Sequence, residues 1–278
     1  MTDNQVVQTY TDAWTHAIEA ISELLAALPS DSWNRATELP GWSVRDVVSH
    51  VIGVESELLG DPRPIHSLPS DLFHVKDDVS RYLELPVDKR RCHTSPEMTA
   101  ELEYVIIRRA RSLRNATTGA DDPVAMPLGP GAYQVPYQRL LQLRAMDLWV
   151  HEQDLRRALG LSGNLDSPGA PITRDVLLAG LPRVVAKSAG APAGTTVALD
   201  VGGPLEFLRT VRVDQDGRGS IDDRITLGPD VRFSTDWETY LRLATGRVRA
   251  DGLPAGRLRV DGDQELAERI LAKFSVMP

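Results

Sequence analysis

The sequence predicts a two-domain protein: an all-α four-helix bundle over residues 1–160, followed by a small α+β domain over residues 161–278. Three observations support this fold class. The chain has 278 residues, which is about the length of two average domains. Apolar residues recur every three or four positions through the first half, as they do in amphipathic helices. From residue 195 onward they alternate with polar residues, which is typical of half-buried strands.

The composition excludes several classes of protein. Lysine and arginine total 31 against 39 acidic residues, and the resulting net charge of −8 argues against a nucleic-acid or anionic-membrane partner. One cysteine, Cys92, cannot form an internal disulfide or a cysteine-based metal cluster. The first residues do not resemble a secretory signal, and no apolar run approaches the ~20 residues of a membrane span. We therefore expect a cytoplasmic protein, and we take it to be a monomer.

The first two predicted helices have clear ends. Residues 6–28 present one apolar stripe, and Pro29 ends the segment. The second helix follows a turn at Pro40 and starts after Ser43, a good N-cap residue. It ends at Gly60, and the valines between these two positions form its buried stripe.

Two further helices complete the predicted bundle. The third starts at Ser95, taken as the N-cap, and continues into an amphipathic stripe. The fourth covers residues 137–159 and ends at a glycine. Between the helices we expect a segment, 61–94, with one short helix near 74–84, and a glycine- and proline-rich loop over 119–136.

The second half reads as a mixture of strands and short helices after a linker at 161–171. Asp216 and Gly217 form the dipeptide of a tight hairpin turn. Thr235 and Glu238 read as a capping box that opens a helix. The remaining expected elements are helices over 174–188 and 265–274, and strands over 195–201, 207–214 and 257–263.

The candidate site consists of polar side chains on faces that should be apolar. His50 lies on the buried stripe of the second helix, and Asp147 and His151 share one face of the fourth because they are four residues apart. A buried carboxylate is costly unless something compensates its charge, and a divalent cation would do so. Two histidines and a carboxylate are the ligand set of an open zinc site. The competing interpretation is a hydrogen-bonded core histidine together with a surface Asp–His pair.

Other residues are weaker candidates. Cys92 is either a reactive thiol next to His93 or, as we expect, an inert one. The basic run 89–91 reads as a solvated face. Trp42 and Trp149 read as core residues.

Particular segments resemble a known family. LPGWSVRDVVSHV and LRAMDLWVHEQDLRRALG resemble the DinB-like metal-binding four-helix bundle and, more closely, the mycothiol-dependent maleylpyruvate isomerase family. TDWETYLRLATGR and GDQELAERILAKF are similar to the sterol-carrier-like C-terminal domain of that family. The resemblance implies that His50, Asp147 and His151 bind the metal, with aspartate where the family has glutamate. It also implies that Asp154 orients a ligand. Arginines far outnumber lysines, which agrees with the GC-rich hosts that make mycothiol.

The resemblance also implies a mechanism. A divalent metal, expected to be zinc, would deprotonate the thiol of mycothiol, which serves as cofactor or co-substrate. In an isomerase the thiolate adds to an activated double bond, the bond rotates and elimination follows. In an S-transferase the thiolate attacks an electrophile and stays attached. Arg242 and Arg247 are the candidate catalytic residues that would hold a substrate carboxylate.

Two other functions fit the same residues. One is a zinc hydrolase that uses metal-bound hydroxide. The other is a non-enzymatic carrier of small molecules or lipids with a structural metal. Nickel, cobalt and iron accept the same ligand set as zinc.

Overall fold

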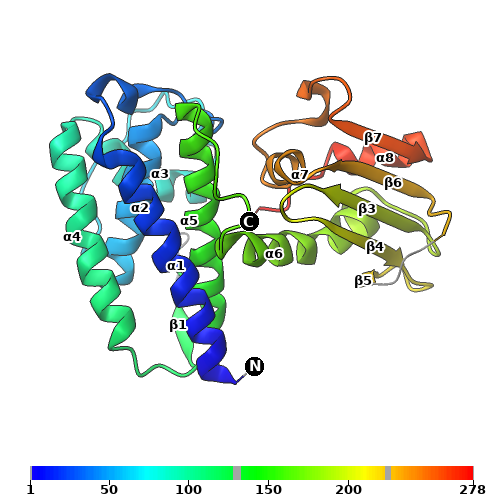
Figure 1. Ribbon diagram of the computed structural model, residues 1–278, viewed down its shortest axis with the longest axis horizontal. Coiled ribbons are helices and arrows are strands. Elements are labelled where there is room, and N and C mark those ends of the chain that lie inside the picture. Colours follow the sequence, from blue (N-terminus) through cyan, green and yellow to red (C-terminus); the bar gives the residue numbers. More distant parts are fainter. Residues whose placement is uncertain (1, 128–132, 223–226, 278) are drawn as a thin grey trace. The chain divides into compact units, whose positions relative to one another are not determined.

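The computed structural model describes residues 2–127, 133–222 and 227–277 (Figure 1). The chain forms two compact units, Met1–Gly169 and Ala170–Pro278. The division falls later than residue 160, the boundary expected from the sequence. The reason is that the segment after the helix Tyr137–Leu159 packs back onto that helix. The indole N–H of Trp149 donates to the carbonyl oxygen of Asn164 at 3.0 Å and to Oγ of Ser167 at 2.9 Å.

The first unit is the predicted four-helix bundle with one additional shorter helix. α1 packs against α4 and α5, and α2 packs against α3, α4 and α5. Valines, leucines, isoleucines and tryptophans fill the space between the helices. The helices are α1 (Asp3–Ala26), α2 (Val44–Leu58), α3 (Asp78–Arg90), α4 (Ser95–Arg114) and α5 (Tyr137–Leu159), with a 3-10 turn at Ser30–Asn34.

Helix starts follow the capping chemistry, with two corrections to the sequence analysis. Ser43 caps α2, as predicted, and its side chain accepts from the backbone N–H of Asp46. The cap of α4 is Thr94, because its hydroxyl accepts from the N–H of Glu97, so Ser95 is already helical. α3 starts at Asp78 because Asp77 caps it, later than the expected helix near 74–84.

The expected loop over 119–136 contains a small hairpin. β1 (Pro123–Ala125) pairs antiparallel with β2 (Gln134–Pro136). Residues 128–132 of this expected loop lie outside the described residues.

The second unit confirms the predicted α+β class. Its sheet has the order β5-β4-β3-β6-β7, in which only β3 and β6 run parallel. α7 packs on β3 and β6, and α8 packs on β6 and β7 (Figure 1). The strands are β3 (Thr196–Gly202), β4 (Phe207–Val213), β5 (Gly219–Asp222), β6 (Val231–Asp236) and β7 (Leu258–Gly262). The helices are α6 (Gly169–Arg183), α7 (Trp237–Ala244) and α8 (Gln264–Leu271), with short turns at Val184–Ser188 and Ala250–Gly252.

Two features of this unit differ from the sequence analysis. The strands β5 and β6 were not expected. Thr235 is a strand residue whose hydroxyl donates to the carbonyl oxygen of Arg257, and Asp236 is the cap of α7 because its carboxylate accepts from the N–H of Thr239. In neither unit is a described helix both long enough and apolar enough to cross a membrane.

Candidate metal centre

α2 and α5 bring the three candidate ligands together inside the first unit. His50 and His151 are 3% and 5% exposed, and the Asp147 side chain is 18% exposed. Nε2 of His50 lies 3.4 Å from Oδ2 of Asp147, and Nε2 of His151 lies 3.5 Å from Oδ1. Each residue offers one ligand atom, and no two of these atoms are more than 4.8 Å apart. The helical spacing therefore does place the three side chains on one spot.

The cluster has the dimensions of a first-row metal site. Ligands bound at ~2.1 Å in a tetrahedron lie ~3.4 Å from one another, close to both nitrogen–oxygen distances. Both ring nitrogens of His50 are buried without a hydrogen bond among the described residues, and Nε2 is the one that faces the carboxylate of Asp147. Two imidazoles and one carboxylate are a donor set that zinc accepts. The residues present therefore fit a divalent cation.

The charges around the cluster favour an ionised carboxylate between two imidazoles. Burial alone would raise the pKa of Asp147, but His151 and Arg144 hold it well below its usual range. Burial lowers the pKa of His50, which keeps that ring neutral. Burial would also lower the pKa of His151, yet the carboxylates of Asp147 and Asp154 raise it. The anionic carboxylate and the neutral His50 ring are the forms that bind metals.

Asp154 orients one of the histidines. Its carboxylate is fully buried, and Oδ2 lies 3.1 Å from Nδ1 of His151. A carboxylate can only accept, so Nδ1 carries the hydrogen and Nε2 keeps its lone pair for the cluster. Arg157 donates to the other oxygen of Asp154 at 2.6 Å.

A buried ion network, which the sequence analysis did not identify, supports Asp147. Arg144 donates to Oδ2 of Asp147 at 2.6 Å and to Oε1 of Glu55 at 2.8 Å. Glu55 also accepts from the Nε atom of Arg109 and from the indole N–H of Trp14. The sequence did contain a signal for the contact between Arg144 and Asp147, since Arg144 is three residues before Asp147 on the same helix face. Its partner Glu55 is 89 residues away, which no local pattern reveals.

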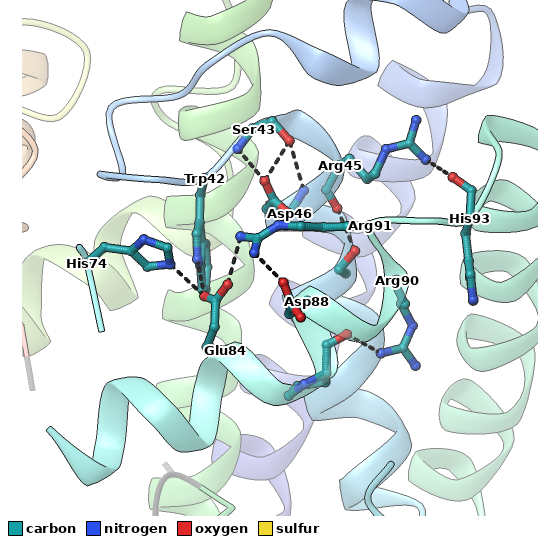
Figure 2. A network of polar contacts seen from close by, with 12 residues as sticks. Trp42, Ser43, Arg45, Asp46, His74, Glu84, Asp88, Arg90, Arg91 and His93 are labelled. Carbon is teal, nitrogen blue, oxygen red and sulfur yellow. Dashed lines mark hydrogen bonds and ion pairs between the residues drawn. The ribbon is translucent and has the colours of Figure 1, made fainter. Parts of the chain in front are cut away.

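Trp42 lies beside the cluster, although the sequence analysis placed it in the core. Its ring centroid is 5.3 Å from that of His50 and 6.4 Å from that of His151. Figure 2 shows how the ring is held: Nε1 donates to the buried Glu84 at 2.9 Å, and His74 contacts the same carboxylate. The other predicted core tryptophan, Trp149, is fully buried.

The expectation that the basic run 89–91 is a solvated face holds for Lys89, which is exposed, but not for the two arginines. Arg91 forms ion pairs with the three carboxylates of Asp46, Glu84 and Asp88 at 2.6 to 3.0 Å (Figure 2). Arg90 is 9% exposed and pairs with Glu101. These arginines hold α3 against α2 and α4, because their partners lie on α2, α3 and α4.

Three candidates remain, one in the first unit and two in the second. Cys92 is exposed, and its Sγ donates to the carbonyl oxygen of Lys89 at 3.6 Å. Arg242 is in α7 and Arg247 follows that helix, so both belong to the second unit. Their role in holding a substrate carboxylate stays a prediction.

Fold and site together define a class: a helical bundle with a buried His–Asp–His cluster, followed by a small α+β unit. The family model described as the mycothiol maleylpyruvate isomerase N-terminal domain matches residues 14–156. The model of the corresponding C-terminal domain matches residues 171–269. The chain therefore belongs to the mycothiol-dependent maleylpyruvate isomerase family, as the sequence resemblance predicted. No match was found among curated proteins.

Solved structures agree with this assignment. The crystal structure of the mycothiol-dependent maleylpyruvate isomerase has a TM-score of 0.56 and 14% identity, with 92% of each chain covered. A histidine-to-alanine mutant of that enzyme has a TM-score of 0.54 and 15% identity, covering 88% of this chain and 91% of the other. At such identities the similarity establishes the two-domain fold. A sterol carrier protein 2 like 2 from Aedes aegypti covers 36% of this chain and 93% of its own at 19% identity, but its TM-score of 0.28 supports no argument.

Proposed function

We propose that the protein is a metal-dependent enzyme that uses mycothiol and acts on a small electrophilic, carboxylated substrate. It would work as a cis–trans isomerase or as an S-transferase, since both reactions need the same activated thiol. The observation that carries the proposal is the convergence of His50, Asp147 and His151 on one spot. Membership of the family supports mycothiol as the thiol.

In this proposal Nε2 of each histidine and one oxygen of Asp147 hold a divalent cation, which we expect to be zinc. When bound, the cation would keep a thiol in its thiolate form at neutral pH. Asp154 keeps the proton of His151 on Nδ1, so that Nε2 stays available. Arg144 restrains the carboxylate of Asp147, so the ligand oxygens are held before anything binds.

The exposed fractions of the three proposed ligand side chains indicate from which side a thiol or substrate would reach the site. The Asp147 side chain is the most exposed, at 18%, against 4% and 6% for the side chains of His50 and His151. A thiol or substrate would therefore approach on the Asp147 side, while the histidines stay shielded from water. Arg242 and Arg247 remain the residues proposed to bind the substrate carboxylate.

Metal analysis combined with mycothiol titration tests the proposal. We expect one equivalent of metal per chain and turnover that requires both metal and mycothiol. His151→Ala should lose the metal and the activity while keeping its helix content by circular dichroism, because the apolar stripes hold the bundle. His93→Ala, a histidine outside the cluster, is the matched control and should retain both.

Other outcomes would contradict the proposal in distinct ways. Metal-dependent turnover without any thiol would indicate a hydrolase. Binding of an apolar ligand that persists in His151→Ala, with no turnover in either protein, would indicate a carrier. Global unfolding of His151→Ala at room temperature would show that the metal is structural.

A further inference from the structure

A cavity of about 520 Å³ opens in the first unit at the tryptophan that lies beside the histidine cluster. Its volume falls within the range of ~300–1,000 Å³ typical of ligand pockets, and a cavity of about 150 Å³ already holds a benzene ring. The walls come from the segments before α2 and α3 and from the first half of α3. The apolar side chains of the lining are Leu39, Pro40, Trp42, Phe73 and Leu83.

The polar side chains of the lining already have partners. Nε1 of Trp42 donates to Oε2 of the buried Glu84 at 2.9 Å, and Nε2 of His74 lies 2.9 Å from the same oxygen (Figure 2). Oγ of Ser80 donates at 2.7 Å to the carboxylate that caps α3. The remaining charged residue, Lys76, is exposed, so its ammonium group can stay in water. The cavity therefore offers a ligand mainly hydrophobic contact.

The aromatic side chains of the lining favour a flat hydrocarbon group. The rings of Phe73 and His74 meet edge-on with their centroids 5.3 Å apart, and Phe73 is 65% exposed, which is unusual for a phenylalanine. The His74 ring lies against Gly41, where any Cβ would clash with Nδ1 and where φ is +79°. Only glycine permits this close approach. Aromatic rings pack well against other rings, both face-to-face with an offset and edge-on.

Trp42 connects the cavity to the candidate metal centre. The same indole that lines the cavity has its ring centroid 5.3 Å from that of His50 and 6.4 Å from that of His151. The cavity is therefore one indole ring away from the cluster. A molecule with two parts could place a hydrocarbon group in the cavity and extend a reactive group past the edge of Trp42 to the cluster.

We propose that this cavity binds the hydrocarbon part of the electrophilic substrate, preferably an aromatic ring, and that Phe73 and Leu83 determine specificity for it. This inference rests on the proposed function, because it takes the cluster of His50, Asp147 and His151 as the place of reaction. The substrate class is then an electrophile joined to an aromatic group. A substrate built only from carboxylate and carbonyl groups would leave the apolar walls unfilled.

Calorimetry on the full-length, metal-loaded protein tests the cavity with trans-cinnamate and crotonate. The two acids share an unsaturated carboxylate, but cinnamate carries a phenyl ring where crotonate has a methyl group. Cinnamate should bind about tenfold or more tightly, because it buries more apolar surface. Phe73→Ala and Leu83→Asn should each weaken cinnamate binding by about three- to tenfold and leave crotonate binding unchanged. Tyr104→Ala, which removes an exposed aromatic ring on α4, is the matched control and should change neither.

Proton relaxation of bound cinnamate tests whether the cavity and the cluster act together. Co²⁺ accepts the same ligand set as zinc, and it is paramagnetic. In the cobalt-loaded protein the vinyl protons of cinnamate should relax faster than in the zinc-loaded protein, because they lie toward the cluster. The phenyl protons should show a smaller increase. Phe73→Ala should reduce the effect at equal cinnamate concentration, whereas Tyr104→Ala should not.

The possible failures of this inference and of the proposed function are distinguishable. Equal affinities for cinnamate and crotonate, or unchanged cinnamate binding in folded Phe73→Ala and Leu83→Asn, would overturn the cavity assignment and leave the metal–thiol proposal intact. Phe73-dependent binding without any relaxation by bound Co²⁺ would overturn the assignment of the cavity to the substrate. A protein that takes up no metal would contradict the proposed function, while Phe73-dependent binding of cinnamate would still support a site for an aromatic group.

Discussion

The two units of the protein have cores of different chemistry. Among the described residues, the buried polar side chains of the second unit are all threonines. Its core is an aromatic cluster in which Trp237 stacks on Tyr240, and Phe207 meets both rings edge-on. The first unit buries carboxylates, guanidinium groups and imidazoles within its helices, among them Glu55, Asp154, Arg109, Arg144, His50 and His151.

This difference indicates that the core of the second unit serves stability, whereas the buried charges of the first unit need another explanation. A buried threonine is easily satisfied: Oγ1 of Thr245 donates to the carbonyl oxygen of Leu241, one helical turn earlier. Buried charges need partners from several helices, and replacing such a pair by apolar residues is often neutral or stabilising. The bundle therefore retains an ion network that hydrophobic packing would not require. The network ends on Asp147, because Arg144 donates to its carboxylate. A metal bound to Asp147 would explain why the bundle keeps this network.

The largest expected effect comes from breaking the ion network. Glu55→Ala removes the acceptor of Trp14, Arg109 and Arg144 and leaves two guanidinium groups buried without it. We expect a loss of about 3–5 kcal/mol in the free energy of unfolding, measured by urea denaturation of the helical circular dichroism signal. Glu103→Ala, an exposed glutamate on α4, should change it by less than about 0.5 kcal/mol. Equal stability of the two variants would show that the network contributes nothing to the bundle.

An intermediate effect is expected at Asp154, and it concerns the metal more than the fold. Asp154→Asn keeps the shape but weakens the hydrogen bond that orients His151. We expect a loss of about 10- to 100-fold in zinc affinity, measured by competition with a chelating dye. Asp166→Asn, at an exposed carboxylate, should leave the affinity as it is. If both variants bound zinc equally well, Asp154 would be a structural residue only.

The smallest effect is expected in the aromatic core. Burial raises the pKa of Tyr240, so its hydroxyl stays protonated, and the oxygen has no hydrogen-bond partner among the described residues. Tyr240→Phe should therefore change the free energy of unfolding of the second unit by at most about 1 kcal/mol, with stabilisation the favoured sign. Tyr240→Ala, which removes the ring contacts as well, should cost about 3–5 kcal/mol. A large loss in Tyr240→Phe would reveal a polar role for this core.

Much of the site could be predicted because helical periodicity is a local property. The spacing of four between Asp147 and His151, and the position of His50 among the valines of α2, are enough to put the three side chains on inward faces. The same holds for Ser43, whose cap needs only the three residues that follow it. These features depend on neighbours within one or two turns, and the sequence displays those neighbours directly.

Only the tertiary structure decided which charges meet. The bond between Arg144 and Glu55 spans 89 residues, and the ion pairs of Arg91 with Asp46 and Glu84 join α2 and α3. The parallel pairing of β3 with β6 likewise joins strands that are separated in the chain by β4 and β5. Long-range partners leave no periodic signal along the chain. The sequence by itself therefore determined the helices and the positions of the three residues of the His–Asp–His cluster, whereas packing decided how Asp147 is held and which arginines are buried.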